Sequence, residues 1–172
     1  MKRKLELALT VIAMAVSAVS SVAQKPTMSS DVLLTVGGKV EHPLNLTRGD
    51  LDKYSRQSVK AKSRDGKEHI YEGVAVGALL LKAGVKFGES LHMEAAASYL
   101  LAEAADGYRV VFALPEFDSP PNDRLILIAD RVDGTPLPTA TGPLQMVVSG
   151  DKGHGRWVRQ LKSLTIQVAP SK

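Results

Sequence analysis

The sequence GPLQMVVSGDKGHGRWVRQLKSLTIQV, residues 142–168, joins two apolar segments through a loop that is rich in glycine and charge. Apolar residues occupy every second position of both segments: Leu144, Met146 and Val148, then Leu164, Ile166 and Val168. This alternation is typical of a strand that buries one face. We therefore predict two strands here, and we expect the chemistry of the chain to lie in the loop between them.

The loop itself, residues 149–159, combines adaptable backbone with groups that bind anions. Its glycines at 150, 153 and 155 permit positive φ and a close approach of the backbone to a ligand. Its charged and aromatic residues are Asp151, Lys152, His154, Arg156, Trp157 and Arg159. Glycine N–H groups and arginine forks together bind phosphate or another oxyanion, although a solvated turn has a similar composition. Trp157 is equally open to two interpretations, a cover for a planar ligand or a core residue with a bonded N–H.

Length and composition predict one domain after an export signal. The chain has 172 residues, 44% of them hydrophobic, which is enough for one sizeable core. Lys2, Arg3 and Lys4 precede an apolar run over residues 7–19, and Ser21-Val22-Ala23 supplies small residues for cleavage. We expect a signal peptide over 1–23, a linker over 24–30 and a domain over 31–170. The mature protein would then be periplasmic or secreted, with no stable membrane span.

Charge and cysteine content exclude several classes of partner. The formal charge of +4 includes +2 from residues 1–23, which hold three basic residues and one acidic residue, so about +2 remains after cleavage. This small charge does not favour nucleic acid as a partner. The chain has no cysteine, so it offers neither a disulfide nor a thiolate. Its four histidines, at 42, 69, 92 and 154, lack the close spacing of metal ligands, and we predict no metal site.

Residues before the loop predict short strands with two short helices. Strands are expected over 32–36, 58–62, 69–71, 98–103, 108–114 and 125–129, and a turn at Arg64-Asp65-Gly66 joins the second and third of these into a hairpin. Thr47 and Asp50 predict a capping box that opens a helix to about residue 54, and a second helix is expected over 74–83, separated from the preceding hairpin by Gly73 and ended by Gly84. Residues 119–123 and 135–143 have the composition of loops. Without regular alternation of strands and helices, the pattern favours an α+β class, a β-rich mixed-sheet domain.

Five segments then occur in a recognisable order: TVGGKV, LTRGDLDKY, YEGVAVGALLLKAGV, AADGYRVVFAL and the long segment that starts at ILIADRVDG and continues to residue 166. Over most of residues 32–168 this order resembles the molybdopterin-binding domain of the sulfite oxidase family, including its small free-standing exported versions. The resemblance implies molybdopterin as a cofactor and assigns the loop over 150–159 to the pterin and its phosphate. By that resemblance the candidate cofactor-binding residues are Gly153, His154, Gly155, Arg156, Trp157 and Arg159.

The sequence also departs from this family at two positions. The family binds molybdenum through a cysteine just before the second helix, in a region that here reads SVKAKSR over 58–64. Lys62 and Ser63 lie near that position, and a serine hydroxyl must lose its proton before it can replace a thiolate. Gln145 stands where family members tend to have arginine. We therefore do not expect the sulfite oxidase reaction.

Three functions remain open from the sequence. The preferred one is a non-catalytic module that binds a small anionic or pterin-type ligand. The alternatives are a molybdopterin-dependent oxidoreductase, in which Ser63 or water completes the metal shell, and a domain that binds an envelope protein. No catalytic residue is assigned: Asp106-Gly107-Tyr108 has the sequence of a hairpin turn, although it could line a pocket, and Glu116 and Asp118 are typical of an acidic turn.

Overall fold

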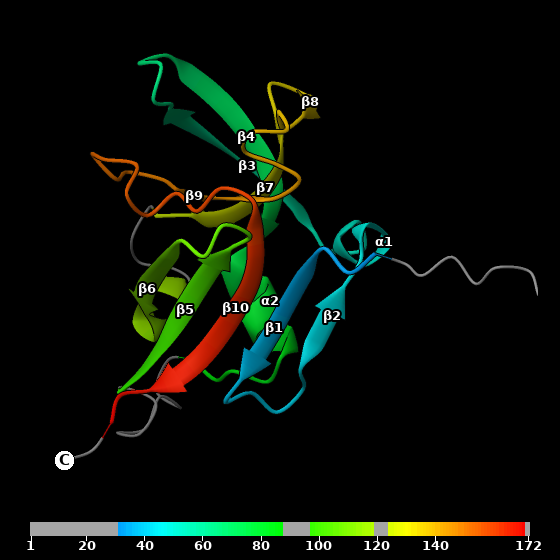
Figure 1. Ribbon diagram of the computed structural model, residues 1–172, viewed down its shortest axis with the longest axis vertical. Helices are drawn as coiled ribbons and strands as arrows, with labels where there is room; N and C mark the ends of the chain where they lie inside the picture. Colours follow the sequence, from blue (N-terminus) through cyan, green and yellow to red (C-terminus); the bar gives the residue numbers. More distant parts are fainter. Residues whose placement is uncertain (1–30, 88–96, 119–123, 171–172) are drawn as a thin grey trace, which may run out of the picture.

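The computed structural model describes residues 31–87, 97–118 and 124–170. These residues form two five-stranded sheets with three short helical segments, so the predicted β-rich α+β class is confirmed (Figure 1). The expected signal peptide, the linker and the loop over 119–123 lie outside the described residues, as does His92. Within the described ranges, no helix is long and apolar enough to cross a membrane.

The first sheet is mixed and brings together the two ends of the domain. Its strands are β1 (Leu34–Gly38), β2 (Leu44–Leu46), β5 (Ser98–Ala104), β6 (Arg109–Ala113) and β10 (Leu161–Val168). Their order is β2-β1-β10-β5-β6, and β1 pairs with β10 in parallel while the other pairs are antiparallel. The predicted hairpin turn between β5 and β6 is present, with Gly107 at a φ of 83°.

The second sheet is antiparallel and centres on β7. Its strands are β3 (Arg56–Lys62), β4 (Glu68–Ala75), β7 (Ile126–Val132), β8 (Thr135–Pro136) and β9 (Gln145–Val148). Both β8 and β9 pair with β7 on the side opposite β4. The β3–β4 hairpin, predicted from the Arg64-Asp65-Gly66 turn, extends at the top of Figure 1.

The helical segments are α1 (Arg48–Leu51), α2 (Val76–Lys82) and the 3₁₀ turn η2 (Leu114–Phe117). The capping box is confirmed, because the Thr47 hydroxyl accepts from the Asp50 N–H at 3.2 Å and the Asp50 carboxylate accepts from the Thr47 N–H at 3.2 Å. Helix α2 contacts β4 and β7, and its C-cap Ala83 is followed by Gly84, whose φ is 86°. One hydrophobic cluster joins both sheets and α2.

Two local predictions are wrong. Gly73 does not separate the hairpin from the helix; it lies inside β4, where a Cβ would sit 1.9 Å from the Ile128 carbonyl oxygen. The strand therefore continues to Ala75 because only glycine allows β7 to approach so closely. In β9, all four residues are buried rather than alternate ones, since this strand is covered on both faces.

Residues 149–160 connect β9 of the second sheet to β10 of the first (Figure 1). The end of this segment runs beside β9, since Met146 donates to the Val158 carbonyl at 2.8 Å and Leu161 donates to the Leu144 carbonyl at 2.9 Å. The connection therefore lies at the junction of the two sheets, where residues from both can reach it.

Candidate functional site

A cavity of about 410 Å³ lies beside this junction. Its walls come from the β3–β4 hairpin, the β7–β8 turn, the connector after β8, the start of β9 and the β9–β10 loop. Ser63 of the hairpin and Gln145 of β9 both line it. The two regions at which the sequence departs from the family that it resembles therefore contribute to the same cavity.

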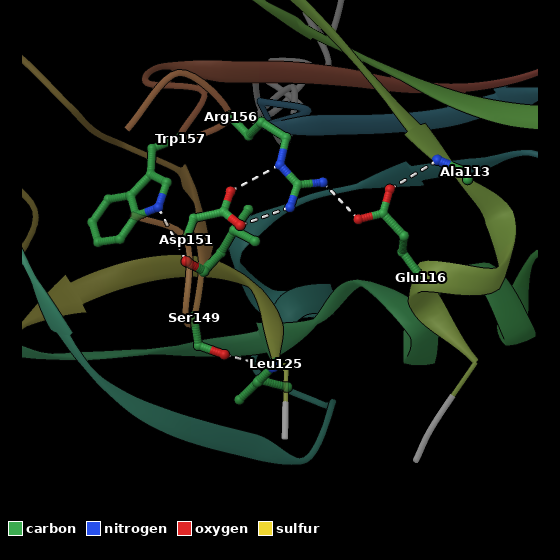
Figure 2. A network of polar contacts seen from close by, with 8 residues as sticks. Ala113, Glu116, Leu125, Ser149, Asp151, Arg156 and Trp157 are labelled. Carbon is green, nitrogen blue, oxygen red and sulfur yellow. Dashed lines mark hydrogen bonds and ion pairs between the residues drawn. The ribbon is translucent and has the colours of Figure 1, made fainter. Parts of the chain in front are cut away.

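The floor of the cavity is formed by buried aromatic and amide side chains. Tyr71, Gln145 and Trp157 line the cavity and are only 5%, 6% and 5% exposed. The Trp157 Nε1–H donates to the Val148 carbonyl at 3.2 Å (Figure 2), and its ring meets that of Tyr71 edge to face, with centroids 5.3 Å apart. Trp157 is thus a core residue with a bonded N–H that also presents part of its surface to the cavity.

His154 ties the loop to the β3–β4 hairpin. Its Nε2 donates to the Lys62 carbonyl at 2.7 Å, since a carbonyl oxygen only accepts. Its ring also packs edge to face with Trp157 at a centroid separation of 4.8 Å. His154 therefore lines the cavity. Its other ring nitrogen, Nδ1, forms no hydrogen bond with the described residues.

Two exposed arginines stand at the rim, Arg64 from the hairpin turn and Arg159 from the end of the loop. Neither forms an ion pair or hydrogen bond with the parts of the chain that the structure describes. A second cavity of about 130 Å³ is lined by both arginines and Trp157, with Asp106 and Tyr108 completing it. The two cavities share Arg64, Trp157 and Arg159, so both guanidinium groups are available to one ligand.

The turn at Asp106 and Tyr108 lines this second cavity and also holds the loop. The Tyr108 N–H donates to the Asp106 carboxylate at 2.9 Å, which stabilises the turn. The Tyr108 hydroxyl donates to the Gly155 carbonyl at 2.5 Å. The motif therefore forms a hairpin turn and also lines a cavity, which are the two interpretations that its sequence allowed.

Arg156 has a different place from the one that the sequence predicted. Its Nε and Nη2 donate to the two Asp151 oxygens at 2.8 Å each, and its Nη1 donates to Glu116 at 2.6 Å (Figure 2). The guanidinium also lies over the Phe112 ring, 5.1 Å from its centroid. Because its fork is occupied by carboxylates of the protein itself, Arg156 anchors the loop to η2 and does not line the cavity.

The same ion pairs stabilise the charged forms of Arg156 and Asp151. Arg156 holds the pKa of Asp151 below its usual range, and the two carboxylates raise the pKa of Arg156 further above neutrality. Glu116 is itself fixed, because its other oxygen accepts from the Ala113 N–H at 3.0 Å. Glu116 thus has a structural role, as the sequence analysis preferred.

Gly153 and Gly155 also differ from expectation. Both are exposed, both lack positive φ, and a Cβ at either would meet nothing within 4 Å. They do not line the cavity, so a close approach of their backbone to a ligand there is not part of this arrangement. In this loop it is Gly150 that has a positive φ, 75°, a conformation that glycine adopts without steric strain.

A carboxylate–histidine cluster beside the cavity was missed by sequence reasoning, which left His69 without a partner. His69 Nδ1 lies 2.6 Å from Asp133 and its Nε2 lies 3.2 Å from Asp65. These hydrogen bonds raise the pKa of His69 and lower the pKa of Asp133, while the pKa of Asp65 is lowered first by the Lys67 N–H and then by His69. The cluster joins the β3–β4 turn to the β7–β8 turn, and the only local signal was the spacing of Asp65 and His69.

The donors that face the cavity are guanidinium, imidazole, amide and hydroxyl groups, which fit an anionic organic ligand. They include no thiolate, since the chain has no cysteine, and so they do not fit molybdenum in the way the family holds it. Among the described residues, no three His, Asp or Glu side chains are grouped as metal ligands.

Comparisons with known proteins agree with this fold. The model of the oxidoreductase molybdopterin binding domain matches residues 22–172. The chain is 35% identical over 107 residues to a nitrate reductase [NADPH] of Fusarium oxysporum, an alignment that covers 59% of this chain and 11% of that protein. The sulfane dehydrogenase SoxCD of Paracoccus pantotrophus has a similar fold, with a TM-score of 0.63 and 24% identity over 80% of this chain and 38% of that one. The chain thus spans a minor part of each relative. It belongs to the family of oxidoreductase molybdopterin binding domains, as its resemblance to the sulfite oxidase family predicted.

Proposed function

We propose that this chain is a non-catalytic module that binds a small anionic ligand of pterin type in the cavity beside Trp157. The observation that carries the proposal is the pair of guanidinium groups of Arg64 and Arg159 at the rim, which have no ion-pair or hydrogen-bond partner among the described residues. Three other arginines of the fold are held in ion pairs: Arg48 and Arg56 both bind Asp130, and Arg156 binds Asp151 and Glu116. Two neighbouring cations that no carboxylate of the described residues pairs favour an anion between them.

The position of these arginines also predicts how the ligand binds. Both are exposed, so their attraction for an anion is weakened by water and is screened within about 10 Å at 0.1 M salt. Their planar forks bind carboxylate or phosphate at two points. We therefore expect modest affinity that falls as ionic strength rises.

Residue chemistry supports a binding role over catalysis. The family ligand for molybdenum is a cysteine, and the cavity offers instead the neutral hydroxyl of Ser63. A hydroxyl has a far higher pKa than a thiol and is a harder ligand. We also propose that the module is exported, on the basis of the charged start, apolar run and small residues over 1–23; the intact mass of the exported protein tests this.

One alternative has an observation in its favour. Ser63 lines the same cavity in a chain that belongs to the oxidoreductase molybdopterin binding domain family, so its hydroxyl is the group that could stand in for the missing cysteine. Elemental analysis of protein purified from a host that makes molybdopterin separates the two functions. Near-stoichiometric molybdenum would establish the alternative, and a content far below one per chain is expected here.

The binding proposal is tested by titration of pterin-6-carboxylate and of inorganic phosphate. Trp157 is the only tryptophan and lines the cavity, so its fluorescence reports occupancy. Arg64→Gln and Arg159→Gln should each weaken binding of pterin-6-carboxylate about two- to fivefold, as the loss of an exposed ion pair implies. Arg131→Gln is the matched control, because Arg131 is exposed on β7 and lines neither cavity.

Failure of both anions to bind at millimolar concentration would contradict the proposal. Equal losses in the control and in the two rim variants would contradict it as well, since they would show a general charge effect without a site.

A further inference from the structure

The carboxamide of Gln145 is a buried polar group that lacks a hydrogen-bond partner in the part of the chain that the structure describes. Gln145 is 6% exposed and forms no hydrogen bond through its side chain with residues 31–87, 97–118 or 124–170. Within those residues no side-chain nitrogen or oxygen is both fully enclosed and unpaired. The amide atoms therefore open onto the cavity that Gln145 lines.

Tyr71 supplies a second group of the same kind. Its side chain is 5% exposed and lines the cavity, and its ring packs against Trp157, but its hydroxyl has no hydrogen-bond partner in the described parts of the chain. Three other polar residues in the walls are engaged: Thr135 donates to the Val132 carbonyl at 3.0 Å, Thr141 donates to the Pro138 carbonyl at 3.2 Å, and both His69 nitrogens face carboxylates. The two floor groups that lack a hydrogen-bond partner, the Gln145 carboxamide and the Tyr71 hydroxyl, are thus both uncharged.

This arrangement divides the cavity by charge. The floor offers an amide and a phenol, neither of which compensates the desolvation of a buried anion. The rim offers the cations of Arg64 and Arg159. A ligand that satisfies both ends must place its charge at the rim and a neutral hydrogen-bonding edge at the floor.

We propose that Gln145, assisted by Tyr71, selects ligands that carry a neutral ring amide, whose adjacent N–H and C=O pair with the carboxamide. A carboxamide presents one acceptor and two donors side by side, so it matches such an edge in two parallel hydrogen bonds. This inference rests on the proposed function and specifies its ligand as a planar ring amide with an anionic substituent.

The test compares two planar bicyclic probes of similar size. Pterin-6-carboxylate has a ring amide and a carboxylate, whereas 2-naphthoate has the carboxylate alone. We expect the wild-type protein to prefer pterin-6-carboxylate by at least about tenfold, as two hydrogen bonds imply. Gln145→Met, which keeps the side-chain length, should reduce this preference about tenfold and leave 2-naphthoate binding unchanged.

Controls separate selection from folding and from the rim. Met146→Leu changes a buried neighbour in β9 that does not line the cavity, and it should keep the preference. Arg159→Gln should weaken both probes equally. In wild-type protein, the ¹⁵N side-chain amide resonance of Gln145 should shift with pterin-6-carboxylate and stay in place with 2-naphthoate, a measurement that needs no variant.

The outcomes distinguish the two proposals. If both probes bind and Gln145→Met leaves their ratio unchanged, or if the Gln145 amide does not respond, the selection by Gln145 is wrong and the anion-binding function stands. If neither probe binds the wild-type protein, both proposals fail.

Discussion

Loss of the Arg156 fork should destabilise the whole junction between the sheets. Three hydrogen bonds of 2.6 to 2.8 Å join its guanidinium to Asp151 and Glu116, and the side chains of these residues are only 28%, 13% and 31% exposed. A hydrogen bond to a charged group contributes roughly 1.5–3 kcal/mol, and three shared bonds do not add. With the contact to Phe112 and a discount for partial exposure, Arg156→Ala should cost about 2–4 kcal/mol.

The conservative variant sharpens this prediction. Arg156→Lys keeps the charge but cannot reach both Asp151 oxygens in parallel, so we expect a loss of about 1–2 kcal/mol. Urea unfolding at neutral pH measures both values, and Arg131→Ala is the control for removal of an exposed arginine, within about 0.5 kcal/mol of wild type. A cost below about 0.5 kcal/mol for Arg156→Ala would refute the anchoring role.

The pH dependence of this anchor has a definite sign. Arg156 lowers the pKa of Asp151 from its ordinary 3.8, so the contribution of the pair is fully present above that value. It is lost as pH falls through the lowered pKa of the folded state. The difference in stability between wild type and Arg156→Ala should therefore be constant near neutrality and shrink in acid; a constant difference down to pH 2 would contradict the assignment.

Two further predictions concern the glycines at 73 and 153 and the titration of His69. Gly73→Ala should lower the free energy of unfolding by at least about 3 kcal/mol, because its Cβ would meet the Ile128 carbonyl. Gly153→Ala, with open space around its Cβ, should leave the stability unchanged in the same urea experiment. Similar costs for both variants would contradict the close approach of β4 to β7. His69 should titrate above its ordinary pKa of 6.5 by NMR, so its share of the stability is present below pH 6.5 and lost as pH rises through the higher folded value. A pKa of 6.5 or less would show that the Asp65–His69–Asp133 cluster does not form.

Local signals predicted the elements of this fold well. The Thr47 capping box, the Arg64-Asp65-Gly66 hairpin and the end of α2 at Gly84 each depend on residues within a few positions of one another. Gly73 was misplaced because its requirement comes from β7, which lies more than fifty residues later in the chain. A glycine inside a strand and a glycine between elements look the same until the neighbouring strand is known.

The same reasoning explains why the loop was only half predicted. Arg156 and Arg159 are three residues apart and chemically identical, yet Arg156 is paired with carboxylates, whereas Arg159 stands at the rim without an ion-pair partner among the described residues. What separates them is Glu116, which approaches from η2 forty positions earlier and completes the pairing that Asp151 begins. Arg64 was missed for the complementary reason, since a turn residue gives no sign of what lies opposite it. The candidate site is therefore a property of the junction, at which the β3–β4 hairpin supplies one cation and the loop supplies the other. The anchor at Arg156 fixes the loop that carries Arg159, and the pairing of one arginine within the protein thus positions the other for a ligand.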